Sequence, residues 1–338
     1  MKERTHYSLL HHNTFGIEAS CRRFVEYATE EEARQTALSL TQDDYPLLII
    51  GAGSNLLLTA DYPSTVITAE NRFDVSPREC GDDVLLRCWA GTTFDDVVAY
   101  AVEHHWHGAE NLSLIPGEVG ASAVQNIGAY GAEAQDIISK VEAVEIATGK
   151  VVTIDAADCG YSYRQSRFKH EWRDKYLITY VTYRLSSVFS PHLDYGNIRQ
   201  RLAENHIVSP TPQQLRETII SIRRDKLPDP AVEGNAGSFF MNPIVSRDVY
   251  QKLAAQWPGM PHYSLADGRE KIPAGWMIEQ CGWKGKSLGR AGVHSKQALV
   301  LVNRGGATGA DVVRLCKAIQ ADVKTQFGID IYPEVNIR

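Results

Sequence analysis

A serine between a glycine and two aromatic residues is a candidate catalytic residue. The run is Gly237-Ser238-Phe239-Phe240-Met241-Asn242-Pro243. Its spacing is not GxSxG and no histidine–acid pair accompanies it, which disfavours a hydrolase nucleophile. A serine hydroxyl can still protonate a strongly basic carbanion or enolate when another group positions it. Taken alone, a hydrogen-bonded turn serine is the more common case.

Two arginine-containing runs could bind anions. Arg164 stands among aromatic and hydroxyl side chains in the run Tyr161-Ser162-Tyr163-Arg164-Gln165-Ser166, and a guanidinium suits carboxylate or phosphate because it donates two parallel hydrogen bonds. A single arginine more often forms a surface ion pair. The run Arg223-Arg224-Asp225-Lys226 suits a diphosphate, and it equally suits the C-terminus of a helix. Glu334 by itself indicates only an exposed carboxylate.

Two glycine-rich segments could hold a phosphate or a flat ring. The run Gly51-Ala52-Gly53-Ser54-Asn55 follows a short apolar strand, and its glycines permit a positive φ and amides aimed at an anion. It is neither a GxGxxG fingerprint nor a P-loop, so an ordinary tight turn is the alternative. Residues 115–120 and 125–131 form a longer stretch with few charges. That composition favours a ligand cradle over a solvent-exposed connector.

Helices and strands must position these residues, and hydrophobic spacing predicts where they lie. Helices are expected over 30–40, 94–102 behind a Thr92/Thr93 cap, from Thr211 to about Arg224, and from Thr308 onward. Strands are expected over 47–50, 84–90, 176–185 and 329–335, and a hairpin from 141–146 and 151–154. Residues 111–131 show no convincing period, and an irregular stretch of that length with apolar residues favours a functional segment.

The mixture of helices and strands predicts an α+β fold, because strict βαβ regularity is missing. The sequence has 338 residues, about right for two or three domains. The run Leu227-Pro228-Asp229-Pro230 is the best candidate for a domain boundary.

Charge and composition exclude several classes of protein. The formal net charge of -6 argues against a general nucleic-acid binder. The six cysteines include no CxxC pair, so buried reduced thiols are expected rather than zinc or disulfide chemistry. The eleven histidines show no metal-ligand pattern, and no metal is expected. No signal peptide and no membrane-spanning run is evident, which makes a cytoplasmic location the default.

Taken together, these runs resemble the family of UDP-N-acetylenolpyruvoylglucosamine reductases, and the resemblance covers nearly the whole chain. Several motifs that follow one another in the same order as in this family identify it far more specifically than any single motif does. The matching segments are 13–15, 51–56, 115–131, Tyr163-Arg164, 237–240 with Asn242-Pro243, 274–279, and Pro333-Glu334-Val335. The run Leu193-Asp194-Tyr195-Gly196 resembles the additional tyrosine loop of the longer type within this family.

The resemblance implies a two-part FAD-binding region of the vanillyl-alcohol-oxidase type and an α+β substrate-binding domain. The implied boundaries are 1–70 and 71–227 for the two FAD-binding subdomains and 228–328 for the substrate domain. Residues 329–338 would be a C-terminal strand that returns to the flavin site. A monomer is expected.

The resemblance also implies the ligand-binding residues. FAD, held without a covalent bond, would contact Gly53, Ser54, Asn55, Gly117, Ser122 and Gly128. The substrate UDP-N-acetylenolpyruvoylglucosamine would contact Tyr195, Lys226, Asn242 and Gln297 through its UDP portion, with Tyr130 near the entrance. Met241 departs from the pattern, because many relatives have lysine there.

In the implied reaction, NADPH reduces FAD and leaves, and the enolpyruvyl nucleotide takes its place. Hydride then passes from flavin N5 to C3, and Ser238 delivers a proton to C2. Arg164 and Glu334 complete the catalytic set by stabilising enolate charge on the substrate carboxylate. The product, UDP-N-acetylmuramate, belongs to bacterial peptidoglycan synthesis.

Two rival functions follow from other uses of such a fold. A flavin oxidoreductase acting on an alcohol or a sugar needs neither a diphosphate site nor a proton donor such as Ser238. A non-catalytic UDP-sugar or flavin-binding module would have no reason to keep Arg164, Ser238 and Glu334 together. NADPH consumption that depends on the enolpyruvyl nucleotide would exclude that module.

Overall fold

The computed structural model describes all 338 residues, and they divide into two compact units. Unit 1 contains residues 1–7, 21–52 and 62–224, and unit 2 contains residues 8–20, 53–61 and 225–338. The chain therefore enters unit 2 three times. The bounds of the four predicted segments (1–70, 71–227, 228–328 and 329–338) stay a prediction.

A four-stranded sheet of unit 1 has the order β1-β2-β5-β3, with β1 (Lys2–Ser8), β2 (Ser20–Tyr27), β3 (Leu48–Ile50) and β5 (Tyr62–Ala69). β5 pairs in parallel with both β2 and β3. Helix α1 (Glu30–Ser39) connects β2 to β3. It begins after Thr29, whose hydroxyl accepts a 3.1 Å hydrogen bond from the amide of Glu32, as expected for an N-cap followed by acidic residues.

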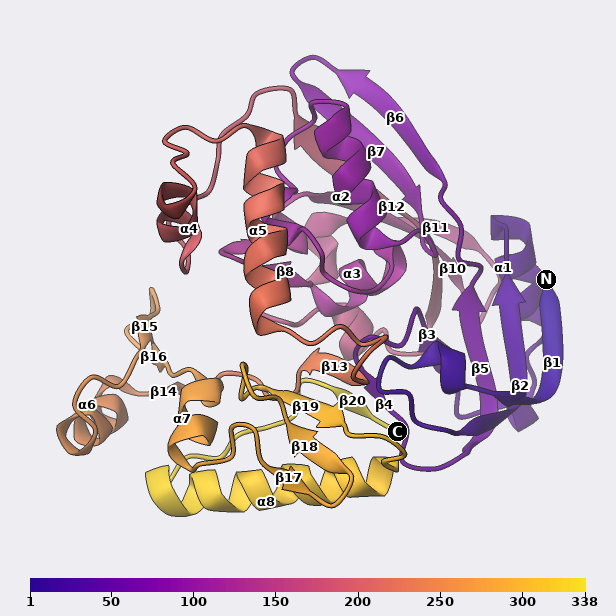
Figure 1. The fold of residues 1–338 in the computed structure, drawn as a ribbon. Helices are drawn as coiled ribbons and strands as arrows, with labels where there is room; N and C mark the ends of the chain where they lie inside the picture. The colour runs from indigo at the N-terminus through magenta and orange to yellow at the C-terminus, as the bar shows by residue number, and fades with distance from the viewer. The chain divides into compact units, whose positions relative to one another are not determined.

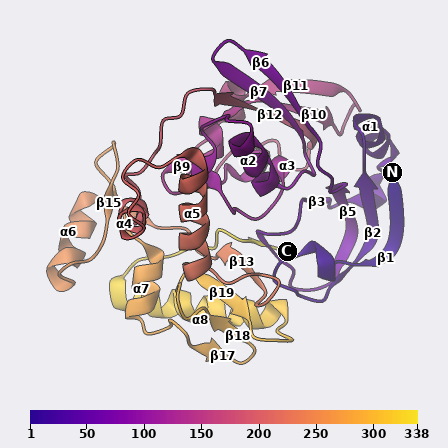
Figure 2. The same cartoon turned by 45° about the horizontal axis from the view of Figure 1, so that its top comes forward.

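A five-stranded sheet forms the other layer of unit 1, in the order β11-β10-β12-β7-β6. Its strands are β6 (Val75–Cys80), β7 (Asp83–Trp89), β10 (Ile138–Glu145), β11 (Val151–Asp155) and β12 (Tyr176–Ser186). Every neighbouring pair is antiparallel. Helices α2 (Phe94–Glu103) and α3 (Val119–Gln125) lie on one face of this sheet (Figures 1 and 2). The predicted hairpin at 141–154 is confirmed.

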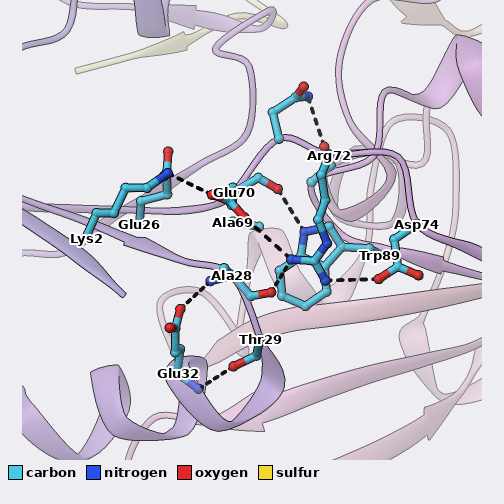
Figure 3. A network of polar contacts seen from close by, with 12 residues as sticks. Lys2, Glu26, Ala28, Thr29, Glu32, Ala69, Glu70, Arg72, Asp74 and Trp89 are labelled. Atoms are coloured by element: carbon cyan, nitrogen blue, oxygen red, sulfur yellow. Dashed lines mark hydrogen bonds and ion pairs between the residues drawn. The ribbon is translucent and has the colours of Figure 1, made fainter.

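A polar network joins the two sheets of unit 1 (Figure 3). The guanidinium of Arg72 lies 4.3 Å from the centre of the Trp89 ring, donates to Asp74 at 3.0 Å, and also donates to the carbonyl of Ala28. Lys2 on β1 bridges two carboxylates, each at 2.7 Å, which belong to Glu26 and Glu70. These contacts fix the loop after β5 against β7.

Two further helices of unit 1 pack together apart from the main core. Helix α4 (Ile198–Glu204) and helix α5 (Pro212–Lys226) share a buried apolar cluster against which Tyr130 packs. Thr211 and Gln214 form the predicted capping box, with hydrogen bonds of 3.2 and 2.9 Å. The guanidinium of Arg216 forks onto the carboxylate of Asp95 at 2.7 and 3.0 Å, which anchors α5 to α2.

Unit 2 contains one main sheet and two smaller ones. The main sheet has the order β13-β19-β18-β17, with β13 (Asn235–Ser238), β17 (Ser287–Leu288), β18 (Ala291–Val293) and β19 (Val300–Asn303). A three-stranded sheet contains β14 (Ile244–Val245), β15 (Tyr263–Ser264) and β16 (Glu270–Lys271). β20 (Asn336–Ile337) pairs in parallel with β4 (Leu56–Leu57).

The helices of unit 2 are α6 (Arg247–Gln256), α7 (Ala274–Gln280) and α8 (Gly309–Phe327). Helix α8 runs along the main sheet in Figure 1 and buries Val312, Leu315, Cys316, Ile319 and Val323, the residues that the spacing predicted. Thr308 and Asp311 form a capping box at its start. No helix of the protein has the length and the apolar character needed to cross a membrane.

Short elements complete the description. β8 (Gly128–Ala129) pairs with β9 (Ala132–Glu133). The 3-10 helices are η1 (Leu10–His12), η2 (Gln42–Asp44), η3 (Glu110–Leu112), η4 (Ala134–Asp136), η5 (Ala156–Cys159) and η6 (Arg167–Lys169).

Three sequence-based expectations were wrong. Residues 329–335 form no strand; Ile329, Ile331 and Val335 are buried, but only Asn336–Ile337 enters a strand ladder. Residues 111–131 are not wholly irregular, because α3 lies inside them. Its small residues are buried on most sides, so no amphipathic period marks the helix. Cys80 is exposed rather than buried.

Candidate active site

The residues that the resemblance implied divide between the two units, and each unit is described by itself. Unit 1 contains Gly117, Ser122, Gly128, Tyr130, Arg164 and Tyr195. Unit 2 contains Gly53, Ser54, Asn55, Lys226, Ser238, Asn242, Gln297 and Glu334.

Arg164 in unit 1 is held against the glycine-rich stretch. Its guanidinium donates to the carbonyl of Gly128 at 2.5 Å and to the carbonyl of Asn126 at 3.3 Å. A Cβ built on Gly128 would lie 2.9 Å from Nη1 of Arg164 and 2.6 Å from the carbonyl of Ala132. Gly128 therefore has to be glycine for Arg164 to lie where it does. Arg164 itself adopts φ 57°, a left-handed conformation that a tight turn imposes at some cost.

Two predicted substrate contacts, Tyr130 and Tyr195, lie close to each other in unit 1. A Cβ on Gly131 would be 3.2 Å from Cβ of Tyr195, and one on Gly196 would be 3.9 Å from the ring of Tyr130. Asn111 donates to the carbonyl of Tyr130 at 2.8 Å, which fixes this turn. Burial raises the pKa of the Tyr130 phenol, so the ring stays neutral at physiological pH.

The sequence around Arg223 suits either a diphosphate site or the end of a helix. Arg223 is not among the predicted site residues. It projects from α5, and its charge interacts with Tyr130, Asp95 and Arg164. Burial lowers the pKa of its guanidinium, and its Nε is buried without a hydrogen-bond partner. Two cations, Arg164 and Arg223, thus act on one region of unit 1 near Tyr130, an environment that suits an anionic ligand.

Gly117 and Ser122, two predicted FAD contacts at α3, have different surroundings. Gly117 adopts φ 117° and its carbonyl accepts from the amide of Phe94 at 3.0 Å. The hydroxyl of Ser122 is fully buried, donates to the carbonyl of Val119 at 2.7 Å, and lies 2.6 Å from the phenol oxygen of Tyr183. That hydroxyl therefore ties α3 to β12.

Glu118 at the start of α3 is a functional candidate that sequence reasoning missed. It is 6% exposed, and burial raises the pKa of its carboxyl to about 7. The signal was present as a single acidic residue inside a glycine-rich stretch that is otherwise almost without charge.

In unit 2, the loop after β3 is fixed by two distant segments. Gly53 adopts φ 67°, and a Cβ on it would lie 2.0 Å from the carbonyl of His12. The carbonyl of Asn55 accepts from the amide of Asn336 at 3.1 Å, and the side-chain amide of Asn55 donates to the carbonyl of Glu334 at 3.4 Å. The amide of Gly53 has no acceptor within the protein.

The segments that contain Ser238 and Glu334 are joined at Phe239, the residue after Ser238. The amide of Glu334 donates to the carbonyl of Phe239 at 2.8 Å, and the amide of Phe239 donates to Leu299 at 2.8 Å. The Phe239 and Phe240 rings are fully buried, whereas Ser238 is exposed and Glu334 is half-buried. The buried rings thus hold the Ser238 backbone rigidly while its hydroxyl remains accessible.

Asn242 and Gln297 meet at the first turn of α7. The side-chain oxygen of Asn242 accepts from the amide of Ala274 at 2.9 Å. A Cβ on Gly275 would lie 3.1 Å from the side-chain oxygen of Gln297. Lys226, the last residue of α5, is exposed. No group of three or more His, Cys, Asp or Glu side chains is placed to hold a metal ion.

Comparisons with known proteins agree on one family. The family described as UDP-N-acetylenolpyruvoylglucosamine reductase, C-terminal domain, matches residues 229–338, and an FAD binding domain matches residues 22–155. A UDP-N-acetylenolpyruvoylglucosamine reductase of Bacteroides fragilis is 54% identical over 330 residues, which are 98% of each chain. One from Pseudomonas aeruginosa is 45% identical over 332 residues, again 98% of each chain.

A solved structure shares the fold. The crystal structure of UDP-N-acetylenolpyruvylglucosamine reductase from Thermus caldophilus aligns with a TM-score of 0.68 at 20% identity, over 99% of this chain and 98% of that one. The predicted α+β fold with an FAD-binding region is confirmed by this match and by the matched FAD binding domain.

Proposed function

Because the chain belongs to the UDP-N-acetylenolpyruvoylglucosamine reductase family, we propose that it reduces UDP-N-acetylenolpyruvoylglucosamine to UDP-N-acetylmuramate with NADPH. The FAD binding domain and the names of the full-length relatives make it an FAD-dependent oxidoreductase. The proposed setting is peptidoglycan precursor synthesis in the cytoplasm, by a monomer.

The residues proposed to hold FAD fit an anionic dinucleotide. Gly53 turns the chain in the left-handed region and offers an amide that has no acceptor in the protein, which is the arrangement of a backbone anion site. Ser54, Asn55, Gly117, Ser122 and Gly128 complete the proposed contacts. When bound, FAD supplies a carrier that accepts a hydride from NADPH and passes it to C3 of the enolpyruvyl group.

Ser238 is proposed to protonate C2 of the substrate. Its exposed hydroxyl sits on a backbone that the buried Phe239 and Phe240 hold in place. A rigid donor fixes the face from which the proton arrives, and hence the configuration at C2.

Arg164 and Glu334 are proposed to act on the substrate carboxylate, where enolate charge develops. Arg164 is already oriented by the carbonyls of Asn126 and Gly128, so little reorganisation is needed when charge appears. Glu334 is positioned by its own amide, which donates to Phe239. Tyr130, Tyr195, Lys226, Asn242 and Gln297 are proposed to bind the nucleotide.

The observation that carries the proposal is the hydrogen bond from the amide of Glu334 to the carbonyl of Phe239, next to Ser238. It supports the proposal because Ser238 and Glu334 are 96 residues apart in sequence (334 − 238) and yet belong to segments joined by this bond. Neither rival function requires that pair.

An anaerobic stopped-flow experiment with Ser238→Ala tests the proposal. NADPH is added first and the enolpyruvyl nucleotide second, while the visible absorbance of FAD is followed. We expect the first rate to stay within about twofold and the second to fall by about 10²–10⁴-fold, the range that general acid catalysis contributes. Ser76→Ala, on an exposed strand, is the matched control and should leave both rates unchanged.

The outcomes separate the alternatives. Equal losses in both half-reactions would remove Ser238 from the proton-transfer step. A wild-type protein that NADPH bleaches and the nucleotide fails to restore would keep the flavin enzyme and reject the substrate. A protein that takes up no FAD would reject the proposed function altogether.

A further inference from the structure

Glu118 is a buried carboxyl whose neighbours leave one of its oxygens facing a cofactor-binding segment. Oε1 accepts a 3.2 Å hydrogen bond from the side-chain amide of Asn71, which also donates to the carbonyl of Gly91 at 3.0 Å. Oε2 lies on the other side, where a Cβ built on Gly51 would come within 2.9 Å of it. The carboxyl thus occupies the space that a side chain at position 51 would need.

The backbone of Glu118 is fixed independently of its side chain. Its carbonyl accepts from the amide of Ser122 at 3.0 Å as the first bond of α3. An antiparallel bridge pairs it with Thr93, and the amide of Val119 donates to Thr92 at 2.9 Å. The backbone of Glu118 is therefore held in place by these contacts, and the carboxyl is held beside Gly51 by the hydrogen bond from Asn71.

No cation compensates a charge on Glu118. From β2, Glu26 raises the pKa of Glu118, and Tyr27 is the other titratable group of that strand which interacts with it. The loop after β5 contributes the neutral amide of Asn71. Arg72, the next residue, directs its guanidinium to Ala28, Asp74 and the Trp89 ring instead (Figure 3).

Burial raises the pKa of Glu118 to about 7, with Glu26 adding to the shift and Asn71 opposing it. A large fraction of the side chain is therefore a neutral acid at neutral pH. Since Oε1 already accepts from Asn71, the proton resides on Oε2, which becomes a donor beside Gly51.

We propose that the neutral carboxyl of Glu118 is part of the FAD-binding surface of unit 1 and, while keeping its proton, donates a hydrogen bond to a phosphate oxygen of FAD, so that ionisation of Glu118 weakens FAD binding. The proposal rests on the proposed role of the glycine-rich loop that begins at Gly51. A phosphate beside an ionised carboxylate meets repulsion, whereas a phosphate beside a carboxylic acid gains a charge-assisted hydrogen bond.

The test measures FAD affinity rather than turnover. Apo-protein is titrated with FAD between pH 6 and 8.5, and the dissociation constant is read from quenching of flavin fluorescence. If only the acid form binds and its pKa is about 7, affinity falls by about 30-fold across this range. Glu118→Gln keeps a donor without a charge, so its affinity should stay flat and remain within about threefold of wild type at pH 6.

Two further variants separate donation from charge. Glu118→Ala should also be flat with pH, but weaker than wild type at pH 6 by about tenfold, the loss of one charge-assisted hydrogen bond. Glu26→Gln should shift the midpoint of the wild-type curve to lower pH, because it removes the charge that raises the Glu118 pKa. Glu110→Gln, a buried carboxyl paired with His107, is the matched control and should keep the wild-type slope.

The failures are distinguishable. A wild-type affinity that is unchanged between pH 6 and 8.5, or a Glu118→Gln protein with the wild-type slope, overturns the role of Glu118 and leaves the FAD enzyme intact. A Glu118→Ala protein that binds FAD as tightly as wild type at pH 6 overturns the proposed hydrogen bond from Glu118 to the phosphate. Absence of FAD binding by the folded wild-type protein at every pH overturns the proposed function itself.

Discussion

Gly128 and Arg164 constrain each other at the residue scale, through a carbonyl and a guanidinium only 2.5 Å apart. The guanidinium reaches that carbonyl because position 128 has no side chain. A methyl group there would meet both Nη1 of Arg164 and the carbonyl of Ala132. The proposed carboxylate-binding group is thus positioned by a residue that does not touch the substrate carboxylate.

Gly128→Ala should therefore impair catalysis by displacing Arg164. A shift of about 1 Å in a charge-stabilising group costs about 10²-fold in rate, so we expect kcat to fall by about that factor. Steady-state kinetics with the enolpyruvyl nucleotide measures it. At Gly81 nothing lies within 4 Å of an added methyl group, but φ is 68°, so Gly81→Ala should lower stability and retain wild-type kcat. A wild-type kcat in Gly128→Ala would show that Arg164 is positioned by other contacts.

Residue types were a poor guide to the environment of the side chains. Ser122 and Glu118 illustrate this limit, because the one uses its hydroxyl inside the core and the other is buried although acidic residues are usually exposed. The pairing of Glu334 with Phe239 beside Ser238 depends on a long-range contact, which no local pattern encodes.

At the scale of elements, α5 and α8 have the caps predicted from the sequence, whereas the predicted cap of α2 is absent, because Thr93 makes no side-chain capping hydrogen bond. Helix α1 was predicted over 30–40 from the acidic residues after Thr29, and the structure has it at Glu30–Ser39. Helix α8 was predicted from its Thr308 cap and apolar spacing, and it begins at Gly309. Helix α3 was missed because Gly120, Ser122 and Ala123 are small and buried. The expected strand at 329–335 was wrong since its alternating apolar residues are buried without partners for a ladder.

The capping box of α8 gives a prediction at this scale. The amide of Asp311 donates to Oγ1 of Thr308 at 3.2 Å, and Asp311 accepts from the amide of Thr308 at 2.8 Å. Thr308→Ala should lower the free energy of unfolding by about 1 kcal/mol. Urea unfolding measures this loss, and Thr308→Ser should restore most of it. An alanine variant as stable as wild type would mean that packing of the apolar face alone sets the end of the helix.

For the whole molecule, two buried carboxyls give opposite dependences of stability on pH. Burial opposes the charge of Asp44, yet hydrogen bonds from Thr41, Arg23 and Thr65 hold the pKa of that carboxyl below its usual range. Its contribution is therefore present above pH of about 4 and is lost as the solution is acidified. Glu118, whose pKa is raised, destabilises the folded protein as pH rises from about 4.5 to about 7.

The free energy of unfolding of the FAD-free protein should fall in both pH ranges, that is, on acidification below about pH 4 and as the pH rises from about 4.5 to about 7. We expect Asp44→Asn to reduce the loss of stability in acid. Glu118→Gln should remove a decline of at most about 3.4 kcal/mol between pH 4.5 and 7, the equivalent of a shift of about 2.5 pKa units. Urea titrations at several pH values measure the free energies. A wild-type stability that stays constant over the second interval would contradict the raised pKa of Glu118.

The pairing of β20 with β4 has a consequence for how the protein is made. The hydrogen bond between Thr59 and Arg338 spans 279 positions of the chain. At a synthesis rate of about 5–20 residues per second, residues 53–61 wait on the order of 15–60 s on the ribosome before their partners emerge. Residues 62–224, which belong to unit 1, are translated during that interval. A nascent chain stalled near residue 224 should therefore resist protease throughout unit 1 while its two early segments of unit 2 are still cut.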